Sequence, residues 1–333
     1  MKRTSPDLPT SKEEVPRWSF EDLVSDLTQA LAKSTDLSLS DLSQKRFPIT
    51  VPVQERLEEV LHELQFGTGA ALLQFPADWL LEQGEEGSQR AFLGLCAHLG
   101  RPVTQSTDLQ ELCARVEVAR SPEVLEAKHT QRRGYRNAQD QFLHNDSSIP
   151  AARGQGVCDV LAMLCFRPAR SGGLSKMASA RKIHELLQQQ PRVLESVRHG
   201  FKYDAASVEY HPDWRQPPTG QEARPMVFED VNGFPCVQYA KNMVETISAA
   251  YAKEGGELDS VKALLKNLED ACSDPAVVQY WDLKAGEAYL VDNYRWLHAR
   301  THFEDDAAAP RLFFRLWLQV ADFERQKTRP CAE

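Results

Sequence analysis

The segment QFLHNDSSIP brings together two side chains that could bind a metal ion. His144 and Asp146 are two residues apart, and on an extended strand residues i and i+2 project to the same face. Two neutral imidazoles and one carboxylate are the ligand set of a mononuclear iron site with open adjacent positions. The pair therefore predicts a metal centre that needs one more, distant histidine.

Taken alone, the pattern His-X-Asp/Glu has little weight. The chain has nine histidines and 48 acidic residues, and it contains the pattern three times. The copy at His211 and Asp213 lies in the proline-rich stretch HPDWRQPP, which cannot extend as a paired strand. The copy at His302 and Glu304 comes directly after His298 and could supply at most secondary contacts to a metal site.

A C-terminal segment supplies the distant histidine. GEAYLVDNYRWLHARTHF presents His298 on a predicted strand and turn, and a second strand begins 13 residues later, at Arg311. Arg311 and Arg315 share one face of that strand with two aromatic residues. Because a guanidinium is rarely buried unpaired, two arginines on one face of an apolar strand predict anionic partners.

In the order and spacing of these motifs, the chain resembles the taurine dioxygenase-like (TauD/TfdA) family of Fe(II)/2-oxoglutarate oxygenases. The resemblance covers about residues 65–320. The motifs are HND, then CFRPARSGGLSKMAS, then DNYRWLHART followed by R-x-x-x-R. The resemblance implies an Fe(II) triad of His144, Asp146 and His298. It also implies that Arg311 binds the distal carboxylate of 2-oxoglutarate, for which its planar fork is suited. Ser175 would contact the same cosubstrate near its metal end, where the family more often has threonine.

Weaker candidates for substrate binding lie outside this set. Arg315 could bind a substrate anion or pair with an acidic neighbour, and both alternatives stay open. Arg132 and Arg136, in KHTQRRGYRNAQDQF, could belong to a basic lid that favours an anionic substrate. They could equally belong to a solvated loop with no such role. Asn242, in CVQYAKNM, is a further candidate.

The resemblance implies an enzyme that oxidises an unactivated C–H bond of a small anionic molecule. It would consume O₂ and 2-oxoglutarate and release succinate and CO₂. An amino acid or a derivative in specialised metabolism is the preferred substrate class, with hydroxylation, desaturation or cyclisation as the outcome. The alternatives are a taurine- or sulfonate-type dioxygenase and a non-catalytic, cupin-like metal-binding protein.

The composition is that of an ordinary globular protein. Of 333 residues, 42% are hydrophobic and 26% charged, so the chain can bury a substantial core. The formal net charge of −9 argues against binding to nucleic acid or to an anionic membrane surface. No stretch approaches the roughly 18 apolar residues of a membrane span, and the N-terminus lacks an apolar signal region. We expect a cytoplasmic protein with a small-molecule partner and leave self-association open.

The seven cysteines are scattered along the chain and never form a CxxC pair. This pattern argues against a disulfide framework and against a zinc knuckle. We expect reduced, mostly buried thiols, since free cysteine is among the residues most often found in protein cores.

The elements that must position the site are predicted to be mainly β, with helical insertions (α+β). Short apolar runs bounded by Gly, Pro, Asn and Asp are typical of an antiparallel sandwich or barrel. They are CDVLAMLCF, PMVFEDVNGFPCVQY, EAYLVDN and RLFFRLWLQV. This organisation resembles a jelly roll, or double-stranded β-helix, with N-terminal helices.

Helical periodicity predicts those N-terminal helices at residues 20–32, 53–64 and 87–99, with a buried strand in GTGAALLQFP between the last two. Two helical insertions are predicted at about 180–190 and 258–271. We expect residues 1–15 to form a polar, disordered tail. Residues 16–333 would form a single oxygenase domain, with the jelly-roll core at about 65–320.

Overall fold

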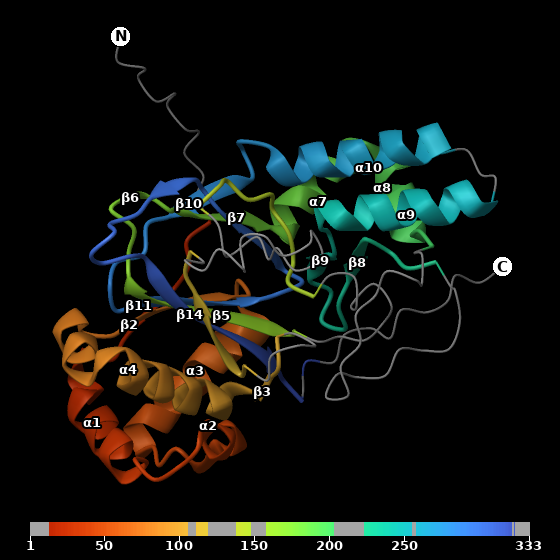
Figure 1. The fold of residues 1–333 in the computed structure, drawn as a ribbon. Coiled ribbons are helices and arrows are strands. Elements are labelled where there is room, and N and C mark those ends of the chain that lie inside the picture. Colours follow the sequence, from red (N-terminus) through yellow and green to blue (C-terminus); the bar gives the residue numbers. More distant parts are fainter. Residues whose placement is uncertain are drawn as a thin grey trace.

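Four layers of secondary structure stack on one another in the computed structural model of the protein (Figure 1). Helices cover the outer face of a large sheet, a smaller sheet faces its inner side, and a second group of helices covers the smaller sheet. The structure describes residues 13–105, 111–118, 138–147, 158–202, 223–254, 258–321 and 323.

The large sheet contains the strand that carries Arg315 and that begins directly after Arg311. Its order is β1-β2-β11-β5-β14-β3, and β4 also pairs with β14. The strands are β1 (Arg17–Ser19), β2 (Ala70–Gln74), β3 (Arg101–Val103), β4 (Cys113–Val116), β5 (Val160–Arg167), β11 (Glu287–Asp292) and β14 (Leu312–Gln319). All pairs are antiparallel except β1 with β2. Every residue of β14 is buried, as expected for a strand covered on both faces.

The first group of helices packs on the outer face of this sheet. It consists of α1 (Val24–Lys33), α2 (Leu39–Asp41), α3 (Val51–Phe66) and α4 (Ala77–Leu99). Pro52 stands in the first turn of α3, where its missing N–H costs no helical hydrogen bond. Gly94 lets α4 approach Phe47, because a Cβ at that position would lie 2.5 Å from Phe47 Cγ. The helices predicted for this region are confirmed.

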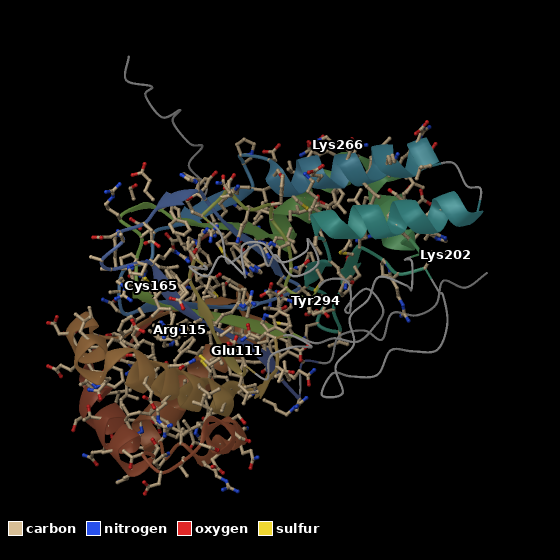
Figure 2. All side chains as sticks on the ribbon, viewed as in Figure 1. Glu111, Arg115, Cys165, Lys202, Lys266 and Tyr294 are labelled. Carbon is tan, nitrogen blue, oxygen red and sulfur yellow. The ribbon has the colours of Figure 1, made fainter. Side chains whose placement is uncertain are left out.

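The smaller sheet has the order β10-β7-β12 and is antiparallel throughout. Its strands are β7 (Ser175–Ser179), β10 (Val278–Trp281) and β12 (Trp296–Arg300). The second group of helices covers it, with α7 (Ala180–Gln188), α8 (Pro191–His199), α9 (Lys241–Glu254) and α10 (Leu258–Ser273). The exposed Lys266 marks the outer side of α10 in Figure 2. Two small strand pairs, β6 (Ser171–Gly172) with β13 (Phe303–Glu304) and β8 (Val227–Glu229) with β9 (Pro235–Val237), complete the fold.

The two sheets meet across a set of buried side chains that we call the inter-sheet cluster. It includes Met163, Phe313 and Trp317 from the large sheet with Met177 and Trp296 from the smaller one. Trp317 and Phe313 share one face of β14, whereas Phe314 and Leu316 on the other face pack against the first group of helices. The strand alternation of β14 therefore directs Arg315 toward the space between the sheets.

Several expectations from the sequence need correction. The fold is mixed α/β and not mainly β. Helices cover the outer faces of both sheets, and across the described ranges more residues lie in helices than in strands. The segment that carries His144 and Asp146 is not a strand, since it forms one bridge, between His144 and His298. Helices α8 and α9 were not expected.

Three further expectations concern the tail, the cysteines and the membrane. Most of the expected tail, residues 1–12, lies outside the described ranges; Glu13 pairs with Arg181 at 3.0 Å, and Val15 packs on the inter-sheet cluster. The six described cysteines are buried and free, as predicted; Cys331 lies beyond them. Within the described residues, no helix is both long and apolar enough to cross a membrane.

Candidate metal centre

Three side chains from two regions converge at the predicted metal site. His144 and Asp146 come from the segment 138–147, and His298 comes from the middle of β12. The Nε2 atoms of His144 and His298 lie 3.6 and 3.8 Å from Oδ1 of Asp146. The ligand atoms all lie within 4.8 Å of one another. The structure therefore brings together the three residues that the sequence predicted as ligands.

The backbone holds the two histidines side by side, with their rings tilted by 46°. The N–H of each donates to the carbonyl of the other, at 3.0 Å from His144 and 2.9 Å from His298, and their ring centroids are 4.4 Å apart. Nδ1 of His144 lies 2.8 Å from the carbonyl oxygen of Phe142. A carbonyl can only accept, so Nδ1 carries the proton and Nε2 keeps its lone pair for a metal.

His298 is buried more deeply than its partner. Burial lowers the pKa of His298 to about 3, and the neighbouring His144 and Arg315 act in the same direction. The ring is therefore neutral near pH 7, as a metal ligand must be. Its Nδ1 has no hydrogen-bond partner among the described residues.

The carboxylate of Asp146 is held through its other oxygen. Oδ2 accepts a hydrogen bond from Nε1 of Trp317 at 2.7 Å and from Nη1 of Arg315 at 3.2 Å. Burial raises the pKa of Asp146, but the positive charge of Arg315, followed by the interactions with His298 and His144, outweighs it and holds the pKa well below its usual range. The group is therefore anionic and presents Oδ1 to the two imidazoles.

Two asparagines fix the backbone on either side of this carboxylate. Asn293 donates from Nδ2 to the carbonyls of Asp146 and Cys158, at 2.9 and 3.0 Å, and its Oδ1 accepts from the Asp146 N–H at 3.0 Å. Asn145 donates to the carbonyl of Asn293 and accepts from the N–H of Tyr239. Both asparagines are buried. They join the metal-binding turn to the turn between β11 and β12.

Arg311 is a buried cation that lacks an anionic partner. It is 3% exposed, and neither an ion pair nor a hydrogen-bond acceptor for its Nε occurs among the described residues. Burial lowers the pKa of Arg311 to about 10, so the guanidinium stays charged near pH 7. A buried, unpaired charge is costly, and this arginine therefore fits the carboxylate of a bound ligand.

Ser175 and Arg300 lie beside one another on β7 and β12, as register partners. Both are buried, and Arg300 follows His298 by two residues on the same face of β12. The guanidinium carbons of Arg300 and Arg311 lie 4.6 and 5.3 Å from the centroid of the Phe303 ring. Burial, followed by the charge of Arg311, lowers the pKa of Arg300 to about 10. Arg300 was not among the site residues predicted from the sequence, although its two-residue spacing from His298 places it on the same strand face.

The remaining predicted site residues have different outcomes. Arg315 pairs with Asp146, so of its two alternatives the structure shows the pairing with an acidic neighbour. It also donates from Nε to Oε1 of Gln105 at 2.7 Å. Asn242 lies in the first turn of α9, but its side chain is outside the described part of the structure. Arg132 and Arg136 fall outside the described residues altogether.

Two facing sheets with a His-X-Asp…His metal-binding group and a buried arginine define a class of mononuclear non-haem iron oxygenases. Residues 33–317 match the family model "Taurine catabolism dioxygenase TauD, TfdA family". The chain therefore belongs to the TauD/TfdA family, and it is an Fe(II)/2-oxoglutarate-dependent dioxygenase.

Similar proteins agree with this assignment. FR-33289 synthase from Streptomyces rubellomurinus is 25% identical over 320 residues, which cover 92% of this chain and 87% of that protein. A crystal structure of asparagine oxygenase has a TM-score of 0.65 at 15% identity and covers 91% of this chain and 93% of its own. The non-heme iron oxygenase OrfP with Fe and L-Arg has a TM-score of 0.60 at 14% identity, with coverages of 92% and 94%. At these identities the two structures show the fold alone.

Proposed function

We propose that this enzyme oxidises a C–H bond of a small anionic molecule, an amino acid or an amino-acid derivative. The observation that carries the proposal is the arrangement of a His144–Asp146–His298 triad beside Arg311, a buried guanidinium without an anionic partner in the described structure. The triad offers ligands for Fe(II), and Arg311 offers the charge that a dicarboxylate cosubstrate needs.

Each residue would have a separate task in the reaction. When bound, Fe(II) with 2-oxoglutarate supplies the activation of O₂ and the oxidation of the substrate C–H bond. Arg311 binds the distal carboxylate of 2-oxoglutarate, and Ser175 contacts the cosubstrate closer to the metal. The inter-sheet cluster around them is apolar and aromatic, and it excludes water from the reacting groups.

The exposure of the ligands indicates where the substrate enters. The side chain of His144 is 29% exposed, against 10% for His298 and 8% for Asp146. On the same side lies Phe142, which is 58% exposed, with Nζ of Lys241 3.7 Å from its ring centroid. A substrate that approaches past His144 therefore meets a lysine, which favours an anionic group such as a carboxylate.

The similar proteins support an amino-acid substrate over the alternatives. Solved structures of this fold are described as asparagine oxygenase with 3-hydroxyasparagine and succinate, and as OrfP with L-Arg. The family description names taurine catabolism, so a sulfonate-type dioxygenase is the second candidate. The oxidation of this substrate could end in hydroxylation, desaturation or cyclisation.

We further propose that the two facing sheets form a jelly roll, or double-stranded β-helix, within a single domain that spans residues 16–333. The support for this arrangement is the shared inter-sheet cluster and the antiparallel pairing in both sheets. We also propose that the enzyme acts in the cytoplasm on a small-molecule partner.

Succinate formation tests the proposed function. Purified protein would be loaded anaerobically with Fe(II) and mixed with 2-oxoglutarate and air, in the presence of a panel of amino acids and sulfonates. We expect one substrate class to stimulate succinate formation, and His144→Ala and Arg311→Ala to abolish it. Arg170→Ala is the control, because Arg170 is an exposed arginine that pairs with Glu304.

Two outcomes would contradict the proposal. Stimulation by sulfonates and not by amino acids would favour the sulfonate-type enzyme. No iron binding and no turnover by the wild-type protein, even in the absence of substrate, would favour the non-catalytic metal-binding alternative.

A further inference from the structure

Trp317 lies on β14, on the same face as Arg315. It is 6% exposed and belongs to the inter-sheet cluster. Its indole N–H nevertheless points at a charged group, because Nε1 lies 2.7 Å from Oδ2 of Asp146. An indole N–H can only donate, and a hydrogen bond to an ionised carboxylate is about twice as strong as a neutral one.

The backbone of Trp317 is fixed on both sides. Within β14 it pairs with Val103 of β3 on one side and with Leu161 of β5 on the other. Asp146 is not paired in a strand, since it lies in a turn that includes Ser147 at a positive φ of 52°. The hydrogen bond therefore connects a metal ligand on a turn to a donor in the middle of a sheet.

The two donors on Oδ2 leave a single oxygen of Asp146 for the metal. A carboxylate can bind a metal through one oxygen or through both. Here Oδ2 is held by Trp317 and Arg315, whereas Oδ1 faces the imidazoles of both histidines. Arg315 stabilises the carboxylate through its positive charge, whereas the uncharged N–H of Trp317 fixes the orientation of the carboxylate by a hydrogen bond.

We propose that Trp317 is a positioning residue of the metal centre, whose N–H restricts Asp146 to binding through Oδ1 alone. This restriction keeps a coordination position open that a second carboxylate oxygen would otherwise fill. The inference rests on the proposed function, since it assumes a metal at the triad. It goes beyond the triad itself because it assigns a role to a residue that does not touch the metal.

The test measures metal binding without turnover. Trp317→Phe keeps an aromatic ring but removes the N–H, and Co(II) binding would be measured anaerobically by calorimetry and by visible absorption. We expect Co(II) affinity to fall about 10- to 100-fold, as for other residues that orient metal ligands. We also expect a changed intensity of the Co(II) absorption bands, because that intensity depends on the number of ligands.

Trp79→Phe is the matched control. Trp79 is also buried and donates its indole N–H, to Oγ1 of Thr28 at 2.9 Å, but within the first group of helices. This variant should lose a similar amount of thermal stability and keep the Co(II) affinity and spectrum of the wild type. A loss of metal affinity caused by general destabilisation would appear in both variants.

A second replacement covers the case in which Trp317→Phe does not fold. Benzothienylalanine at position 317 keeps the shape of the indole and replaces the N–H with sulfur, and it should show the same weakened binding. Wild-type affinity and an unchanged spectrum in a folded position-317 variant would overturn the role of Trp317 and leave the proposed function intact. A wild-type protein that binds neither Co(II) nor Fe(II) would overturn both.

Discussion

Strand β14 and the segment 138–147 both contribute to the metal centre, but they are positioned in different ways. Every residue of β14 is buried, and the strand pairs with β5 on one side and with β3 and β4 on the other. The segment 138–147 has one bridge, between His144 and His298. Beyond that bridge, the segment makes isolated backbone hydrogen bonds, from the N–H of Gln141 to Arg300 and from the N–H of Asn145 to Tyr239. The turn at Asp146 itself is held by side chains, chiefly those of Asn293 and Trp317.

This difference separates stability from metal binding. Backbone pairing holds β14 and Arg315 in place. A substitution that damages the packing of β14 therefore reduces the stability of the whole sheet. Side-chain hydrogen bonds hold Asp146, so their loss moves a ligand with a smaller effect on the fold. A few buried polar residues therefore determine the position of a ligand on the turn, while the position of the sheet stays the same.

The largest effect on stability is expected from Phe314→Ala. Phe314 lies on the outer face of β14, is fully buried and packs edge-on against Phe166 at 5.9 Å between ring centroids. Loss of a buried phenylalanine typically lowers the free energy of unfolding by about 3–5 kcal/mol, which denaturant titration would measure. Metal affinity of the folded variant should stay close to that of the wild type. A large loss of affinity would contradict the separation of the two properties.

Asn293→Ala should affect metal affinity strongly and the free energy of unfolding only weakly. It removes the hydrogen bonds from Asn293 to the N–H and carbonyl of Asp146, so Co(II) affinity should fall about 10- to 100-fold. The free energy of unfolding should fall by only about 1–3 kcal/mol, because buried backbone groups lose partners. Asn267→Ala is the control, since Asn267 donates to the Ala263 carbonyl on the exposed side of α10. Equal affinities in the two variants would contradict the role of Asn293.

The metal ligands could be predicted from the sequence, whereas the contacts that orient them could not, except that Arg315 was given an acidic neighbour as one of two alternatives. His144, Asp146 and His298 combine side chains and spacings that few other roles require. The sequence places Trp317 on the same strand face as Arg315 and places Asn293 close to His298, but neither position identifies Asp146 as the partner. Their contacts with Asp146 depend on how the chain brings distant segments together, which spacing does not encode.

The fold divides in a similar way. The periodicity of α1, α3 and α4 predicted helices, because apolar residues repeat along one face. Helix α8 was missed, since it begins with a proline that reads equally well as part of a loop. The segment around His144 was predicted as a strand from the two-residue spacing of His144 and Asp146 alone. The turn at Asp146 and Ser147 ends its pairing after one bridge.

The smallest effect concerns the stability of the metal-free protein at low pH. Burial lowers the pKa of His298 to about 3 in the folded state, and an unfolded histidine titrates near 6.5. The unfolded state therefore takes up the proton first, so this contribution to stability is complete above about pH 6.5 and is lost as the pH falls toward 3. The loss should reach about 2 kcal/mol at about pH 5.

Unfolding measured between pH 7 and pH 5 on the wild type and on His298→Gln isolates this contribution, because the other titratable groups are common to both proteins. The variant should lose less stability over that range than the wild type. Equal slopes would mean that the His298 ring takes up a proton in the folded state, which its burial between the sheets and its contact with His144 both oppose.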